Sequence, residues 1–154
     1  IPTAIGFYKP IFLRKSTVLS ELGVDVVALS QFGIKEVKSG EFVGYGISYL
    51  AQTNITTAVV PVGYSLGYSR SLSNKGRVLI RGHRCSVIGI VNMNMMIIDI
   101  TNVKSVEVGD EVVLIGKQGK LEIKVSAFSD LSEELNYEIL AHLSESIPRI
   151  VVKK

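Results

Sequence analysis

The chain has 154 residues, of which 47% are hydrophobic and 20% are charged. These values are typical of one ordinary globular domain and argue against a disordered or fibrous protein. The net charge of +3 comes from 17 basic and 14 acidic residues without a block of one sign, so it is too small to indicate nucleic acid as a partner.

Membrane and secretion signals are not found in the sequence. The longest apolar run, from Cys85 to Ile100, is interrupted by Asn92 and Asn94 and is shorter than the ~20 residues that a spanning helix needs. Cys85 is the only cysteine, which excludes an internal disulfide bond and favours a reducing, cytoplasmic compartment. The chain begins at Ile1 without signal-peptide features, and we interpret it as a piece of a longer protein.

Short runs rich in valine and isoleucine follow one another along most of the chain. The predicted strands are 10–19, 24–32, 41–50, 55–62, 77–82, 86–91, 95–101, 105–116 and 120–126. Turn-forming sequences lie between several of them, namely SNKG at 73–76, RGHR at 81–84 and GKQGK at 116–120. Many short strands at this spacing predict a mainly β fold, a Greek-key-like β-barrel.

Tyr45 lies between Gly44 and Gly46 inside the predicted strand 41–50. Glycine weakens a strand and usually marks a bulge or the close approach of another group to the backbone. In one interpretation the tyrosine ring fills the space that the glycines leave, and in the other that space admits a ligand. The longest irregular stretch, 63–76, is rich in glycine, serine and tyrosine, and a loop of this length is more often functional than not.

The periodicity changes near the C-terminus. Leucine and isoleucine recur about every four residues between 131 and 143, which predicts one or two short helices, and a last strand is predicted after Pro148. His83 and His142 have no second ligand at metal-binding spacing, so no metal site is predicted. Cys85 reads as a small buried residue. We treat 1–154 as a single domain.

Five segments, taken in this order, resemble the C-terminal domain of bacterial alanine racemase. They are VGYGISY at 43–49, VVPVGYSLGYSRSLSNKGRVLIRGHR at 59–84, VIGIVNMNMMIIDIT at 87–101, VEVGDEVVLIGKQG at 106–119 and LNYEILAHLSESIPRIV at 135–151. The resemblance is nearly continuous from 41 to 152. Residues 1–40 resemble only loosely the strands that lead out of the barrel of that family.

The resemblance implies a pyridoxal 5'-phosphate enzyme that converts L-alanine to D-alanine for peptidoglycan precursors and works as a head-to-tail homodimer. In that family a preceding (β/α)₈ barrel carries the cofactor on a lysine. Tyr45 resembles the acid/base tyrosine that this domain lends to the active site of the partner subunit. Met93 resembles a residue bordering the substrate carboxylate, Tyr64 one at the substrate entrance, and Tyr137 the tyrosine that hydrogen-bonds the cofactor phosphate.

The chain also departs from the family pattern. Nothing in it resembles the lysine motif of the barrel, so we expect the isolated chain neither to bind the cofactor covalently nor to racemise alanine. Ile90, Asn92 and Asn94 stand where the family usually has arginine, cysteine or serine, and aspartate. Ser65 and Leu66 replace the usual alanine and aspartate.

Three alternatives stay open. The chain could be a small β-barrel binding module for a protein or nucleic acid, with basic hairpin residues as its surface, although it lacks an aromatic stacking platform. It could be a domain whose catalysis has lapsed, as the altered VNMNMM segment suggests. Serine could replace alanine as the substrate, since an apolar pocket discriminates weakly against one added hydroxyl.

Overall fold

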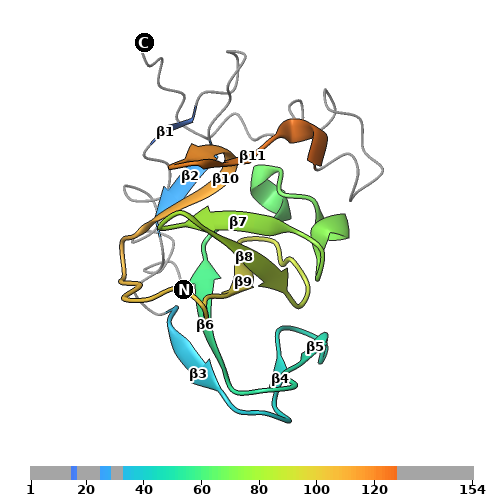
Figure 1. Cartoon of the computed structure of the whole chain (residues 1–154). Helices are drawn as coiled ribbons and strands as arrows, with labels where there is room; N and C mark the ends of the chain where they lie inside the picture. Colours follow the sequence, from blue (N-terminus) through green and yellow to red (C-terminus); the bar gives the residue numbers. More distant parts are fainter. Residues whose placement is uncertain (1–14, 17–24, 29–32, 128–154) are drawn as a thin grey trace.

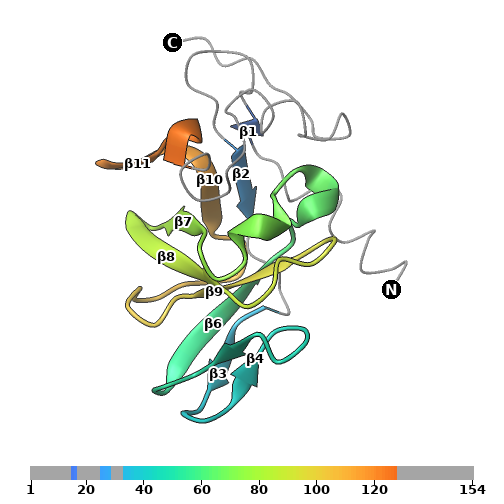
Figure 2. The ribbon, with the colours of Figure 1, turned by 90° about the vertical axis from the view of Figure 1, so that its right-hand side faces the viewer.

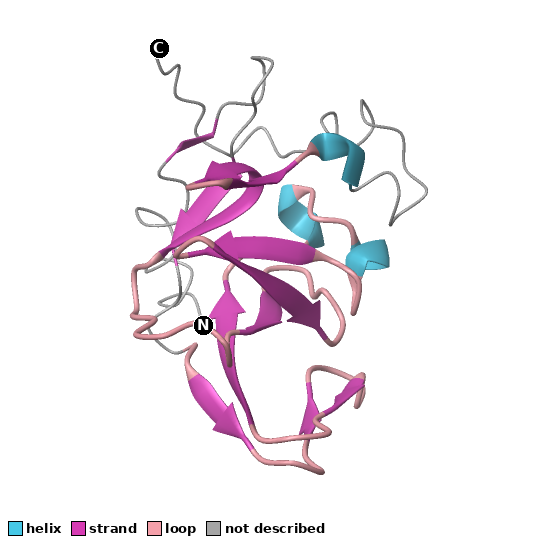
Figure 3. Cartoon of the chain, viewed as in Figure 1, coloured by secondary structure: helices cyan, strands magenta, loops and turns pink. Residues whose placement is uncertain are grey.

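The computed structural model describes residues 15–16, 25–28 and 33–127. Its main feature is an antiparallel sheet of nine strands (Figures 1 and 3). These strands are β1 Lys15–Ser16, β2 Asp25–Ala28, β3 Lys35–Val37, β6 Ile55–Val60, β7 Arg77–Ile80, β8 His83–Ile88, β9 Met96–Asp99, β10 Glu111–Gln118 and β11 Leu121–Ile123. A separate two-stranded sheet contains β4 Phe42–Val43 and β5 Tyr49–Leu50. The predicted mainly β class is confirmed.

The large sheet follows one hydrogen-bonded path in the order β1-β2-β10-β7-β8-β9-β6-β3, with β11 beside β10. The tight turn between β7 and β8 contains Arg81 and Gly82, with φ angles of 47° and 74°. Two successive positive φ angles are the geometry that favours two-residue hairpins, and RGHR had predicted a turn here. Strand β10 pairs with β2, β7 and β11 and thereby joins the N-terminal strands to the middle of the chain.

The main hydrophobic core is formed by side chains from the strands of this sheet. Its buried side chains alternate along β9 and form consecutive runs in β7 and β10, which are therefore covered on both faces. Tyr68 and Leu72 close it from the loop that precedes β7. A smaller cluster packs beneath the β4–β5 hairpin and consists of Val37, Val43, Ala51, Ile55 and Ile88.

Two predictions about the elements are wrong. The predicted strand 41–50 is a hairpin, because positive φ angles at Gly44, Gly46 and Ile47 turn the chain between β4 and β5. Strand β3 was not predicted, since only one of its three side chains is buried and it lacks an apolar pattern.

The stretch 63–76 was predicted to be irregular and contains two short 3₁₀ helices, η1 Tyr64–Leu66 and η2 Arg70–Leu72. Figure 2 shows β3 and β4 at the opposite end of the molecule from β10 and β11. Residues 125–127 are helical, and the predicted helices and last strand beyond them lie outside the described residues. Within the described ranges no helix is both long enough and apolar enough to cross a membrane.

Candidate functional site

Tyr45 lies in the turn that joins β4 to β5, and it is 72% exposed. Gly44, Gly46 and Ile47 in the same turn have φ angles of 85°, 69° and 56°. Glycine adopts positive φ without steric strain, so the turn itself explains both glycines. The chain therefore presents this phenol at the surface, on a turn rather than on a strand.

The space beside Gly44 faces the backbone of another loop rather than the phenol. A Cβ atom at Gly44 would lie 2.9 Å from Ser48 Oγ and 3.4 Å from Gly89 Cα. At Gly46 the nearest atom would be Ile90 Cδ1, at 4.0 Å. The interpretation that both glycines clear room for a ligand is therefore wrong for Gly44, which instead lets two backbones approach each other.

That second backbone is the loop between β8 and β9, residues 89–95, which we call the central loop. On one side it contacts η1, where Tyr64 N donates to Asn92 O at 3.1 Å and Ser65 N donates to Met93 O at 3.0 Å. A Cβ atom at Gly63 would lie only 2.0 Å from Asn92 O, so a side chain there would separate the two segments. These contacts bring Tyr64 and Met93 onto neighbouring backbones, with exposures of 42% and 53%.

Two of the departures from the family pattern meet in this contact. Ser65 Oγ donates to Asn94 Oδ1 at 2.9 Å and so adds a side-chain bond to the two backbone bonds. A neutral hydroxyl and a neutral amide thus join η1 to the central loop. Asn94 therefore keeps the hydrogen-bonding capacity of the usual aspartate without its charge.

On its other side the central loop contacts the Tyr45 turn. Ile90 N donates to Ser48 Oγ at 3.1 Å, and Asn74 links the two segments through its side-chain amide. Ser73 Oγ accepts a further bond from Val91 N at 2.9 Å. The structure thus gathers Tyr45, Tyr64 and Met93 around one loop, although they are far apart in the sequence.

Tyr137, the predicted contact of the cofactor phosphate, lies outside the described residues. Sequence reasoning missed Ser48, Ser73 and Asn74, which tie the segments together. Serine and asparagine in turn-forming stretches are ordinary, so their composition gave no signal for this role.

Three segments that meet at the central loop, which we call the face, contain no charged residue, although exposed Arg70 and Lys75 lie in the adjoining stretch 70–76. They are 43–50, 59–69 and 86–98, and their composition is apolar apart from serine, asparagine and tyrosine. Large exposed apolar side chains gather on them, including Phe42 beside the turn, Ile47, Leu50 and Met95. An exposed apolar area of this kind usually marks an interaction site.

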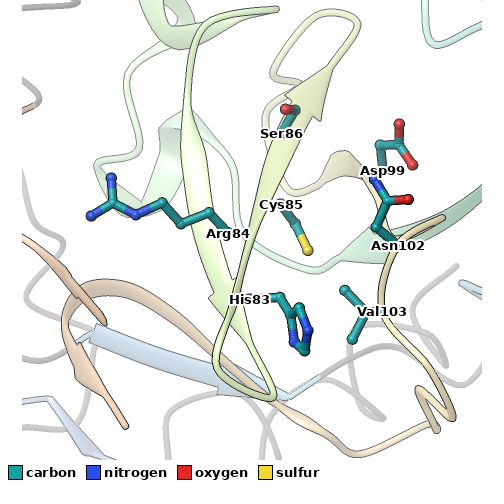
Figure 4. Close-up of a pocket in the computed structure, with 7 residues that line it drawn as sticks. All are labelled: His83, Arg84, Cys85, Ser86, Asp99, Asn102 and Val103. Carbon is teal, nitrogen blue, oxygen red and sulfur yellow. The ribbon is translucent and has the colours of Figure 1, made fainter. Parts of the chain in front are cut away.

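A cavity of about 150 Å³ lies elsewhere, between β8 and the segment after β9 (Figure 4). His83, Cys85, Asp99 and Asn102 are among the residues that line it, and the side chain of Arg84 points away from them. Burial, together with the nearby Asp99 charge, raises the pKa of the Cys85 thiol to about 11. The interpretation of Cys85 as a buried residue is confirmed, and the thiol is protonated and unreactive at neutral pH.

The basic residues of the β7–β8 hairpin bind to this chain itself. Arg81 forms a two-bond ion pair with Asp110, at 2.7 and 3.0 Å. Arg84 donates to Glu122 O, and Arg77 donates to the backbone at 75 and 76. These arginines nevertheless remain exposed. Among the described residues no three His, Cys, Asp or Glu side chains are placed to hold a metal ion.

This architecture, an antiparallel β domain in which the Tyr45 turn and η1 both bond to the central loop, matches a known class of enzyme domain. The family described as "Alanine racemase, C-terminal domain" matches residues 28–151. The chain belongs to this family.

Relatives and solved structures agree with that assignment. The alanine racemase of Halothermothrix orenii is 42% identical over 116 residues, which are 75% of this chain and 31% of that protein. The crystal structure of alanine racemase from Bacillus anthracis with bound L-Ala-P has a TM-score of 0.77 and 31% identity, covering 84% of this chain and 32% of that one.

The structure of alanine racemase from Bartonella henselae with covalently bound pyridoxal phosphate has a TM-score of 0.75 and 28% identity, covering 84% of this chain and 34% of that one. The chain thus spans about a third of the length of the relatives that it matches.

Proposed function

We propose that this chain is the tyrosine-bearing C-terminal domain of an alanine racemase, and that Tyr45 acts as an acid/base group on alanine in the active site of a partner subunit. The observation that carries the proposal is the exposed Tyr45 turn, which bonds to the same central loop that carries Met93 and that bonds to η1. Family membership supports the same reaction.

Racemisation removes the α-proton from one face of an amino acid and returns a proton to the other face. Two acid/base groups are therefore needed on opposite sides of a planar carbanion. A phenol has an unperturbed pKa of about 10, so a tyrosine is an effective base near neutral pH only where a cation or strong donor stabilises the phenolate. Segments 43–50, 59–69 and 86–98 contain no such cation. The assisting group therefore comes from outside these segments.

Residues of the face could border pyridoxal phosphate, but they could not anchor it. When bound, this cofactor supplies an electron sink for the α-carbanion. Tyr64 and Met93 suit the border of a planar ligand, but the three segments of the face offer neither a lysine for a covalent bond nor a cation for the phosphate. We therefore assign the anchoring of the cofactor to a preceding barrel domain, and a contact with its phosphate to Tyr137.

The exposed apolar side chains of the face support a homodimeric arrangement in which a partner covers them. Their uncharged surroundings make this burial cheap, because no ionised group has to be desolvated. The proposed setting is cytoplasmic, with alanine as the small-molecule substrate and with neither a nucleic acid nor a membrane as partner.

The test is Tyr45→Phe in the natural polypeptide that carries this chain, assayed with alanine in both directions. We expect kcat to fall by about 10² to 10⁴, the usual contribution of an acid/base group, with an unchanged melting temperature. Tyr49→Phe is the matched control, because it removes the same hydroxyl four residues away, where Tyr49 packs against the small core. Unchanged turnover in Tyr45→Phe would contradict the role of Tyr45.

Two further measurements separate the remaining alternatives. A wild-type protein without racemase activity would indicate lapsed catalysis, and a kcat/KM for serine above that for alanine would change the substrate.

The isolated chain, mixed with pyridoxal phosphate and L-alanine, is expected to form no D-alanine. D-alanine above the uncatalysed background would show that no barrel domain is needed.

A further inference from the structure

Asn74 lies where three segments of the chain meet: the turn before β7, the central loop and the Tyr45 turn. Its own N–H donates to Gly89 O at 3.1 Å, and Gly89 N donates back to Asn74 Oδ1 at 2.6 Å. Its Nδ2 donates to Ser48 O at 3.1 Å. One side chain thus bonds to both neighbouring segments and uses its acceptor for one and its donor for the other.

The Tyr45 turn needs such support. Strands β4 and β5 have two residues each and form a sheet separate from the nine-stranded one. A two-stranded hairpin alone is marginally stable in water. Its buried anchor is Val43, and the turn beyond that residue carries exposed side chains.

The contacts that fix the far side of the turn converge on two residues of the central loop, Gly89 and Ile90. Ser48 Oγ accepts from Ile90 N, and the backbones at Gly44 and Gly89 are close enough that a Cβ on either glycine would lie 3.4 to 3.5 Å from the Cα of the other. Asn74 holds Gly89 by two bonds while it holds Ser48 by a third. The Asn74 side chain therefore adds two bonds, one to each segment, to the direct contacts between the turn and the central loop.

The backbone of Asn74 agrees with that role. Its φ angle is 58°, in the left-handed region that asparagine tolerates better than most residues. This conformation turns the chain immediately before β7 and places the amide between the two loops. An ordinary turn asparagine would satisfy its own neighbours, whereas this one bonds to residues 15 and 26 positions away.

We propose that Asn74 is a positioning residue for Tyr45: its amide fixes the distance between the Tyr45 turn and the loop that carries Met93. The catalytic part of this proposal rests on the proposed function of Tyr45. The structural part, in which Asn74 forms a clamp between Ser48 and Gly89, does not depend on that function.

Two substitutions separate the parts of the clamp. Asn74→Gly keeps the positive φ without strain and removes both side-chain bonds. Asn74→Asp keeps an acceptor for Gly89 N and loses the donor to Ser48 O. Ser73→Ala is the matched control, because it removes the side-chain bonds to Val91 N of the same central loop and to Arg70 O, and neither bond involves the Tyr45 turn.

The first readout is amide hydrogen exchange in the natural polypeptide, which requires no activity. Asn74→Gly should lose protection at Gly89 and Ile90, Asn74→Asp should keep it at Gly89, and Ser73→Ala should change only Val91. Unchanged protection at Gly89 in Asn74→Gly would overturn the clamp.

The second readout is catalytic. Because small displacements of a catalytic group are costly, we expect kcat to fall about tenfold in Asn74→Gly, with KM within about twofold of the wild type. Asn74→Asp should show a smaller fall in kcat, and Ser73→Ala a change below about twofold. A rise in KM without a fall in kcat would overturn the positioning role.

The isotope effect of α-deuterated alanine shows whether Tyr45 itself is displaced. If Tyr45 is displaced, proton transfer to Tyr45 becomes slower. The deuterium isotope effect on kcat should then rise for the alanine enantiomer that Tyr45 deprotonates and stay the same for the other enantiomer. Equal changes for both enantiomers indicate general loosening and overturn the role. An inactive wild type overturns the proposed function and this catalytic role together, while hydrogen exchange still decides on the clamp.

Discussion

The sheet and the face around Tyr45 are stabilised by different kinds of contact. In the sheet, residues such as Leu79 and Ile98 are fully buried, and neighbouring strands pair through their backbones. On the face, large apolar side chains are exposed, and the loops are joined by serine and asparagine side chains that bond to backbone groups. Burial thus determines the fold, whereas a few polar bonds and close glycine contacts determine the relative positions of the functional residues.

The largest expected effect on stability is in the sheet. Leu79→Ala should lower the free energy of unfolding by about 2 to 5 kcal/mol, because it leaves a cavity in the main core. Denaturant titration measures this loss. At a temperature where the variant is still folded, kcat of the natural polypeptide should stay within about twofold of the wild type. A larger change in kcat would show that the two regions are not separable.

A smaller loss of stability, with a functional effect, is expected at Gly63. Gly63→Ala would place a Cβ 2.0 Å from Asn92 O, so the central loop has to move away from η1 at a cost of about 1 to 3 kcal/mol. KM should rise, because Tyr64 and Met93 separate.

Gly40→Ala is the reference for this variant. Its added Cβ meets no atom within 4 Å, and its cost is that of the left-handed backbone alone, about 1 kcal/mol. Equal losses of stability in the two variants, with an unchanged KM in Gly63→Ala, would show that the contact does not position the site.

The smallest effect is expected at the ion pair between Arg81 and Asp110, far from the face. Hydrogen bonds from Arg81 hold the pKa of the Asp110 carboxyl below its ordinary value. A lowered folded-state pKa adds stability that is present above the unfolded value of about 3.9 and is lost as the pH falls toward the folded value.

Thermal melts of the wild type and Asp110→Asn should therefore differ at pH 7 and converge as the pH falls below about 3.9. The racemase activity should not change at pH 7. A difference in melting temperature that grows in acid would mean that another group is responsible.

Much of the sheet could be predicted from the sequence, because short runs rich in valine and isoleucine mark the buried strands β6, β7 and β9. The same rule failed for β3, which is short and mostly exposed. It also failed at 41–50, where alternation continues through a turn whose conformation depends on Gly44 and Gly46 rather than on hydrophobicity.

The roles of Tyr45, Tyr64 and Met93 followed from the family resemblance and stay predictions. The structure shows that the segments carrying these residues meet at the central loop. No local pattern could show that the exposed Asn74 bonds to Ser48, because that contact depends on the three-dimensional path of two other loops. The assignment of Tyr137 stays a prediction.

Strand β10 has a consequence for the order of folding during synthesis. It lies between β2 and β7 in the sheet, yet it follows both in the chain. Until the ribosome has released residues 111–118, β7 keeps an unpaired edge and its apolar side chains lack part of their cover. The main sheet is therefore incomplete until residues 111–118 have been synthesised, and until then the nascent chain must protect the open, apolar edge of β7 from other strands.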